Sequence, residues 1–166
     1  MVLTLLRTIK TFYIGNGLSH GHGKITNEAG ATIETTAGIS NGVYGNGNGT
    51  IENSGTLNNR GDFYNGQEGS GTINNYSGGT INAWNLYNSS YYSNSTGVIN
   101  NYAGATLTSN GYSYNYSHGI IENSGILNNN RVGSNGGEFS NSGTINNQNE
   151  GLLANNNGNF YNGNLN

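Results

Sequence analysis

The chain has 166 residues, of which 32% are hydrophobic and 8% charged, with no Pro and no Cys. The lack of Cys excludes disulfides and thiolate metal sites, and a formal net charge of -3 gives no basic stripe for nucleic acid as a partner. Such a composition can indicate disorder, but disordered tracts are poor in aromatic and β-branched residues, whereas this chain has 12 Tyr and regularly spaced Ile. We therefore expect an ordered protein.

Residues 1–20 form an opening segment, expected to be an N-terminal cap or a strand. Its apolar residues follow helical spacing, while its Thr residues suit a strand equally well, so both alternatives stay open. The apolar run from Val2 to Leu6 is too short for a secretory signal, and we expect no membrane span. The apolar residues at helical spacing are Val2, Leu5, Leu6, Ile9, Phe12 and Tyr13.

From residue 21 to residue 166 one five-residue phrase recurs six times: Gly, any residue, an aliphatic residue, any residue, Asn. Neighbouring phrases lie 22 to 26 residues apart, a period typical of stacked repeat proteins. Because side chains of a strand alternate between its faces, the aliphatic residue and the final Asn share the inner face. The aliphatic positions are Ile25, Ile51, Ile73, Ile99, Ile121 and Ile145. The Asn positions are Asn27, Asn53, Asn75, Asn101, Asn123 and Asn147.

These two sets predict a core aliphatic column and a structural ladder of buried Asn side chains. A buried amide needs hydrogen-bond partners, and identical amides stacked one rung apart can bond to each other along the stack. Asn also tolerates the left-handed backbone that a corner requires. Each Asn is therefore expected at the corner where its strand ends.

Each turn is predicted to contain two further arms. The second arm follows the phrase after one to three residues and one small residue, and includes Thr32–Glu34, Thr56–Asn58, Thr80–Asn82, Thr106–Thr108, Ile126–Asn128 and Leu152–Ala154. The third arm carries larger core candidates: Val43, Phe63, Leu86, Tyr112, either Val132 or Phe139, and Phe160. Three short strands and three corners per turn describe an all-β, single-stranded parallel β-helix, or β-solenoid, of about six rungs of 20–26 residues.

The repeated Gly-Thr-Ile-Asn-Asn phrases with one stacked Asn per turn resemble the Asn/Gly-rich parallel β-helix repeats of adhesins, autotransporter passenger domains and viral or phage fibres. The resemblance covers residues 21–166. It favours a right-handed coil, because left-handed hexapeptide solenoids have a tighter and more regular turn. It implies an extracellular, cell-surface or virion-surface location, but the same architecture serves adhesins, fibre shafts, polysaccharide lyases and ice-binding proteins, so it does not fix the function.

The acidic and imidazole side chains give little support for an enzyme or a metal site. A glycosidase needs two carboxylates about 5 to 10 Å apart, whereas Glu52 and Glu122, the clear column-mates, are three rungs or about 14 Å apart. His20 and His22 can face the same way, but two imidazoles without a third ligand make a weak metal site. We expect no catalytic residues, no metal and no cofactor.

The outer surface offers several alternative binding features. Tyr76 and Tyr102 follow the ladder Asn in adjacent rungs and are expected to stack outside. The possible glycan or partner surface consists of Tyr76, Tyr102, Trp84, Tyr91 and Tyr92, because exposed aromatic rings suit sugars and partner proteins. Core packing and stacking between rungs is the alternative reading of the same aromatic residues.

Other outward positions suggest lateral contacts, ice binding and glycosylation. Outward Thr residues form an array that resembles an ice-binding face, interrupted at Val98, Ile120, Ile126 and Leu152, which instead suggest a lateral contact. Among the sequons, Asn88 and Asn94 are expected in a polar loop and are the possible N-glycosylation sites. Asn75 is also in a sequon, but as a ladder residue it is expected to be buried.

The sequence therefore predicts a non-enzymatic structural protein that assembles with itself. Terminal rungs of a solenoid present unpaired strand edges unless they are capped, and no capping element is evident after Phe160. We expect a subunit of a filament, fibre or surface adhesin that stacks head to tail. The alternatives are a carbohydrate-binding module that uses the Tyr-rich face of rungs three and four, and, less favoured, an ice-binding protein.

Overall fold

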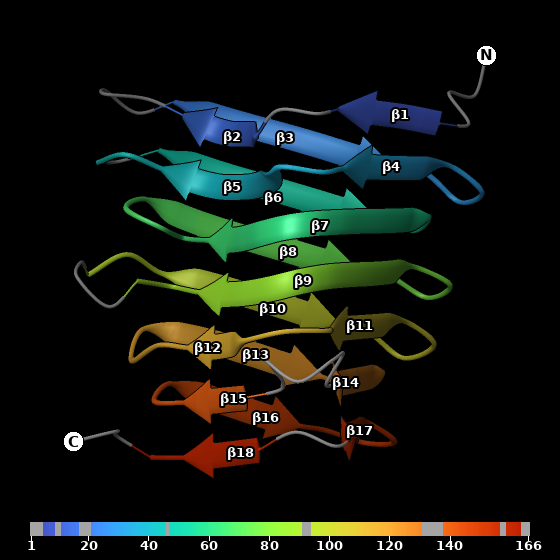
Figure 1. Ribbon diagram of the computed structural model, residues 1–166, viewed down its shortest axis with the longest axis vertical. Coiled ribbons are helices and arrows are strands. Elements are labelled where there is room, and N and C mark those ends of the chain that lie inside the picture. The colour runs from blue at the N-terminus through green and yellow to red at the C-terminus, as the bar shows by residue number, and fades with distance from the viewer. Residues whose placement is uncertain are drawn as a thin grey trace.

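The computed structural model describes residues 5–8, 11–16, 21–45, 47–90, 94–130, 138–156 and 159–163, and in these ranges it contains strands and turns but no helix. The strands coil into a parallel β-solenoid, with every strand pair parallel. In Figure 1 the chain descends from the N-terminus at the top, with front strands running to the left and back strands to the right, which is a right-handed coil. Both the fold class and its hand agree with the sequence-based expectation.

The strands fall into three arms, and each arm stacks only on itself. The first arm is the six-stranded sheet of β3 (His22–Asn27), β6 (Asn48–Asn53), β8 (Ser70–Asn75), β10 (Gly97–Asn101), β13 (Gly119–Asn123) and β16 (Thr144–Asn147). The second arm contains β1 (Leu5–Thr8), β4 (Thr32–Thr35), β11 (Thr106–Ser109), β14 (Ile126–Asn130) and β17 (Leu152–Asn156). The third arm contains β2 (Phe12–Asn16), β5 (Gly38–Val43), β12 (Ser113–Asn115), β15 (Glu138–Asn141) and β18 (Asn159–Asn162).

Two long strands, β7 (Thr56–Asn65) and β9 (Thr80–Asn88), each run through the second and third arms of one rung without a break. The expectation of three separate strands in every rung is therefore wrong for rungs two and three. The second and third arms belong to one 12-stranded sheet, and Figure 1 shows this sheet in front of the first arm. The solenoid is thus flattened into two layers with the core between them.

The opening segment supplies strands and extends the coil. Among the described residues β1 pairs in register with β4, and β2 pairs with β5. Of the two alternatives for residues 1–20, the described parts therefore adopt the strand. They add a partial rung, made of the second and third arms only, ahead of the six predicted rungs.

The core consists of three hydrophobic columns in register. The first-arm column is the predicted one, and Ile51, Ile73 and Ile99 are completely buried within it, while Ile25 and Ile145 in the outermost rungs are partly buried. The second-arm column comprises Ile33, Leu57, Ile81, Leu107, Leu127 and Leu153. The third-arm column comprises Phe12, Ile39, Phe63, Leu86, Ser113, Phe139 and Phe160.

The third-arm column differs from the predicted one in rungs one and four. Val43 is buried, but Ile39 is the residue in register with Phe63. Tyr112 was expected inside and is instead 39% exposed, while its neighbour Ser113 takes the core position between Leu86 and Phe139. Strand alternation explains the difference, because moving the register by one residue reverses every side chain. Val132 lies outside the described residues.

The predicted Asn ladder runs through the first corner. Each amide nitrogen donates to the side-chain oxygen of the Asn one rung further along, at 2.7 to 2.8 Å, from Asn27 through to Asn147. The same nitrogen also donates to a backbone carbonyl in most rungs; Asn101, for example, reaches the carbonyl of Ile126 at 2.9 Å. The middle members Asn53, Asn75 and Asn123 are completely buried.

A second Asn ladder, which the sequence analysis missed, lies at the corner between the third and first arms. Five amide-to-amide bonds of 2.7 to 2.8 Å join its six members. Each member lies two residues after the third-arm column residue, with Ser or Tyr between them, and this short pattern was the available signal. Its members are Asn41, Asn65, Asn88, Asn115, Asn141 and Asn162.

The third corner carries no continuous ladder. In register order its residues are Thr35, Asn59, Ala83, Ser109, Asn129 and Asn155. Among these six residues, only Asn129 and Asn155 form a bond between side-chain amides, at 2.7 Å. This corner between the second and third arms is therefore the one whose side chains vary from rung to rung.

Replacing a ladder residue should cost far more stability than replacing its neighbour. Asn101→Ala removes an amide that accepts from Asn75 and donates to Asn123 and Ile126, and buried groups left unpaired cost about 1–3 kcal/mol each. We expect urea unfolding to show a loss of about 2–4 kcal/mol. The control Asn100→Ala removes one half-buried bond to Asn74 and should cost less than about 1 kcal/mol. Equal losses would refute the ladder's structural role.

Ser113→Ala should stabilise the protein. The Ser113 hydroxyl is completely buried and has no hydrogen-bond partner among the described residues, so its removal relieves a desolvation cost of about 1 kcal/mol. The measurement is the thermal unfolding midpoint. The control Ser109→Ala removes a buried hydroxyl that contacts the carbonyl of Trp84 at 3.5 Å and should not stabilise. A lower midpoint for Ser113→Ala would show that the hydroxyl is bonded.

Candidate functional site

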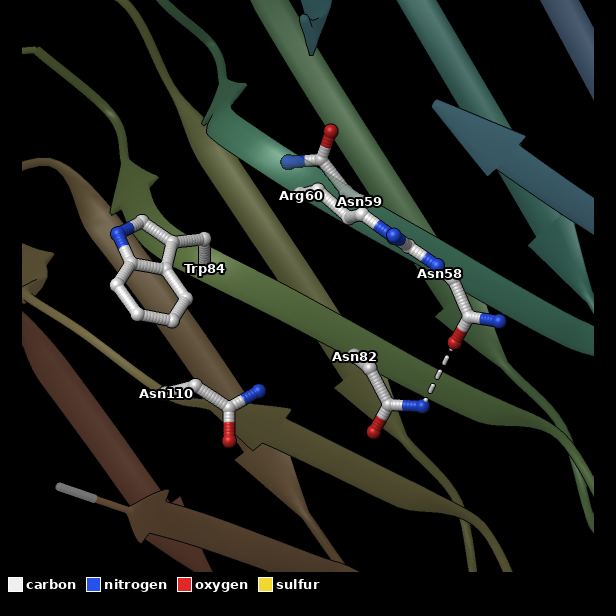
Figure 2. A pocket seen from close by; sticks show the side chains of 6 residues that line it. All are labelled: Asn58, Asn59, Arg60, Asn82, Trp84 and Asn110. Carbon is white, nitrogen blue, oxygen red and sulfur yellow. Dashed lines mark hydrogen bonds between the residues drawn. The ribbon is translucent and has the colours of Figure 1, made fainter. Parts of the chain in front are cut away.

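An open pocket of about 640 Å³ lies outside the corner between the second and third arms. Figure 2 shows the indole of Trp84 on one side, Asn110 below it, Asn58 and Asn82 opposite, and Arg60 along the top. The six residues that line it are Asn58, Asn59, Arg60, Asn82, Trp84 and Asn110. They come from rungs two, three and four, so strand stacking rather than sequence proximity brings them together.

A β-bulge creates the space. Between the pairs Asn59–Ala83 and Asp62–Asn85 the register shifts, so that Arg60 and Gly61 of β7 lie opposite the single residue Trp84 of β9. A bulge of this kind bends the strand and redirects the side chains around it. On the other side of Trp84, the backbone N–H of Gly111 in the next rung donates to the carbonyl of Trp84 at 2.7 Å. A Gly residue therefore lies beside the Trp84 backbone in each neighbouring rung.

The pocket's amides are only partly engaged. Asn82 donates to the side-chain oxygen of Asn58 at 2.9 Å, and among the described residues the Asn58 nitrogen and the Asn82 oxygen have no hydrogen-bond partner. Asn110 contacts the carbonyl of Ala83 at 3.3 Å. The side chain of Trp84 is 42% exposed.

A column of stacked tyrosines occupies the outer face of the third arm. The ring centroids of Tyr64 and Tyr87 are 4.7 Å apart, and those of Tyr87 and Tyr114 are 5.7 Å apart, with nearly parallel planes. Tyr112 and Tyr116 extend the cluster at 6.4 and 5.7 Å from Tyr114. The three alternating residues from 112 to 116 thus share one face.

The tyrosine column holds its phenols in the neutral form. Burial raises the pKa of Tyr64 to about 12, assisted by the negative charge of Asp62 and a 3.2 Å hydrogen bond from the phenol to it. Burial also raises the pKa of Tyr87, with Asp62 again contributing. For Tyr114 burial is the main cause of a raised pKa, followed by the charge of Glu138. The carboxylate of Asp62 also accepts a hydrogen bond from the side-chain amide of Asn85 at 2.7 Å.

Among the described residues of the predicted glycan or partner surface, Trp84 lies apart from Tyr76 and Tyr102. Tyr76 and Tyr102 stack at the first corner, with centroids 5.2 Å apart and planes 7° apart, as the sequence indicated. Trp84 lies on the other sheet, in the pocket described above. Tyr91 and Tyr92 lie outside the described residues. The sequence analysis missed Arg60 and the pocket's amides, because only the bulge and the register bring them to Trp84.

The residues predicted as a lateral contact form two separate pairs. Val98 lies in register with Ile120 on the first arm, whereas Ile126 lies in register with Leu152 on the second arm. Ile126 and Leu152 are exposed, and the other two are half-buried. Outward Thr residues occupy the same second-arm column in the four preceding rungs: Thr32, Thr56, Thr80 and Thr106.

The placement of one predicted glycosylation residue is wrong. Asn88 was expected in a polar loop, but it is completely buried as a member of the second ladder. An oligosaccharide cannot be attached there without breaking the ladder. Asn94 is exposed, and Asn75 is buried as predicted.

The acidic residues are separated as the repeat spacing predicted. Glu52 and Glu122 share one outward column three rungs apart, with Asn74 and Asn100 between them. Lys24 pairs with Glu52 at 2.8 Å, and the amide of Asn146 donates to Glu122 at 2.7 Å. His22 contacts the side chain of Asn48 at 3.4 Å, and His20 lies outside the described residues. Within the described ranges no three His, Asp or Glu residues are grouped for metal binding.

Comparisons with known proteins add no family to this description. No family model matches the chain, and no match was found among curated proteins or among solved structures. The architecture is therefore defined by the parallel β-solenoid and its Asn ladders. No helix in the described part of the chain meets the length and hydrophobicity needed to span a bilayer.

Stability should fall as the pH rises from 10 to 12. Because the pKa of Tyr64 in the folded state lies above its unfolded value of 10.0, the folded state holds a proton that the unfolded state releases. The stability that the protonated Tyr64 adds to the folded state is fully present below pH 10.0 and is lost as the pH rises through about 12. Denaturant unfolding across this range should show the decline, and Tyr64→Phe should make it shallower. Ultraviolet titration showing every phenol ionising together near pH 10, without loss of stability, would contradict this expectation.

Proposed function

We propose that the protein is a non-enzymatic structural subunit of a filament, fibre or surface adhesin, and that copies stack head to tail. The observation that carries the proposal is a match between the two ends of the coil. The first strands of the second and third arms begin Leu5-Leu6 and Phe12-Tyr13, while the last strands of these arms contain Leu152-Leu153 and Phe160-Tyr161. The register places these pairs in the same columns.

The last rung differs from the middle rungs at the outward position of the second arm. Leu5 and Leu152 occupy the column that holds Thr in rungs one to four. Leu152 is 52% exposed, which is unfavourable for an isolated molecule and favourable for a residue covered by another copy. Similarly, Phe160 is only partly buried although its column-mate Phe139 is completely buried. A further rung would complete its packing.

The strand edges support the same contact. Within the described residues β16, β17 and β18 pair on one side only, and so do β1, β2 and β3. Unpaired edges are templates for the addition of strands. In the proposed stack β1 and β2 of one copy pair with β17 and β18 of the next. Among the described residues, the first arm contributes one strand fewer than either of the other two arms.

The outer surface suits a structural role outside the cell, the location proposed here. Few side chains are charged, and stacked Asn and Tyr side chains cover much of the outer faces. Ice binding is less well supported, because the column of four Thr residues gives way to Ile126 and Leu152 and has no second Thr column parallel to it along the same strands.

Engineered cysteines should trap the stack. In the variant with Tyr13→Cys and Tyr161→Cys, the thiol at 161 of one copy lies in register with the thiol at 13 of the next. Neighbouring strands are about 4.8 Å apart, within the range that a disulfide spans, whereas the two positions within one chain are about six rungs or 29 Å apart. We expect oxidation to give a series of covalent multimers on non-reducing gels, with lengths that increase with protein concentration.

The matched control combines Tyr76→Cys with Tyr161→Cys. Tyr76 is also exposed but lies at the first corner in a central rung, so oxidation should give no long series. The chain contains no native Cys, so every disulfide arises from the introduced residues. Equal multimer patterns for the two variants, or micrographs with only isolated particles at high concentration, would refute head-to-tail stacking.

A further inference from the structure

We propose that the Trp84 pocket is a binding site for an acidic glycan, in which a pyranose ring carrying a carboxylate stacks on the indole. This inference does not depend on the stacking of copies. The pocket's volume of about 640 Å³ falls within the range of about 300–1,000 Å³ typical of small-ligand sites. Its openness to solvent along the sheet suits a segment of a longer polymer.

Trp84 provides the platform for the sugar ring. The indole is 42% exposed, and the bulge places Arg60 and Gly61 together opposite it. One face of a pyranose presents only C–H groups, whose slightly positive hydrogens are attracted to the negative face of an aromatic ring.

The amides opposite the indole can bond the hydroxyl groups of a sugar. Asn82 donates to the side-chain oxygen of Asn58 at 2.9 Å, and Figure 2 shows the Asn58 nitrogen turned away from Trp84, so the Asn82 oxygen is the group left for a ligand. An amide oxygen accepts a hydrogen bond from a sugar hydroxyl. The bond between the two Asn residues also holds this oxygen in place before a ligand binds, which lowers the entropic cost of binding.

Arg60 gives the site its preference for an anion. It is exposed, and no carboxylate among the described residues lies within 4.0 Å of its guanidinium group. Arg binds carboxylates through two parallel hydrogen bonds, so a sugar acid is better matched than a neutral sugar. None of the six lining residues is Asp or Glu, and the pocket therefore lacks the two carboxylates that glycoside hydrolysis requires. The ligand is bound and not cleaved.

The single Trp of the chain makes binding directly visible by fluorescence. The probe is a galacturonic acid tetrasaccharide, compared with its methyl ester, which keeps the ring and loses the charge. We expect the acidic tetrasaccharide to change Trp emission with a dissociation constant on the order of 1 mM, as for a small exposed site. The ester should bind about tenfold more weakly.

Calorimetry on variants tests each part of the site. Trp84→Ala should abolish measurable binding of both probes, and Arg60→Gln should reduce binding of the acid to the level of the ester. Both residues are exposed, and unchanged circular dichroism and thermal midpoints check that the fold survives. The control Tyr76→Ala removes another exposed ring at a distant corner and should bind as the unaltered protein does.

Several outcomes would overturn the proposal. An absence of any heat or emission change with 10 mM acidic tetrasaccharide, an order of magnitude above the expected constant, would exclude an acidic-glycan site. Equal affinity for the acid and the ester would refute the role of Arg60. Weaker binding in Tyr76→Ala than in Trp84→Ala would place the sugar on the first corner instead. None of these results bears on whether copies stack.

Discussion

The structure depends on the hydrogen bond between buried Asn side chains of successive rungs. An amide carries a donor and an acceptor, so it can accept from the rung before and donate to the rung after without leaving a buried group unpaired. Ladder members such as Asn53 and Asn88 also donate to backbone carbonyls at the corners. A chain of such bonds holds adjacent turns one strand spacing apart and in register, because a slipped turn would leave buried amides unpaired.

The ladders also explain why small residues begin the strands next to them. A Cβ on Gly71 would lie 2.5 Å from the side-chain oxygen of Asn65, and one on Gly79 would lie 2.5 Å from that of Asn75. The Gly at the start of the recurring phrase is therefore required by the second ladder. The small residue before each second-arm strand is required by the first ladder. Gly and Asn therefore occur together at the corners, and the fold accounts for the abundance of both residue types.

The architecture could be predicted from the sequence because the same residue type recurs at each repeated position. The column from Ile25 to Ile145 and the ladder from Asn27 to Asn147 could be found by alignment of the chain with itself. The second ladder was harder, since the residues before its members vary between Ser and Tyr. The Trp84 pocket could not be predicted, because it arises from one extra residue in β7. The burial of Ser113 in place of Tyr112 could not be predicted either, since a one-residue shift in register decides which of the two is buried.

The uniform direction of the ladders gives the coil two chemically different ends. Every ladder nitrogen donates toward the C-terminal rung, and every strand pair is parallel. A second copy added in the opposite orientation would have to pair its strands antiparallel to those of the first copy, and its columns would no longer continue. A copy added in the same orientation keeps parallel pairing and brings the Leu-Leu and Phe-Tyr pairs of the two ends together. The proposed head-to-tail stacking would therefore give a polar filament, in which every copy points the same way.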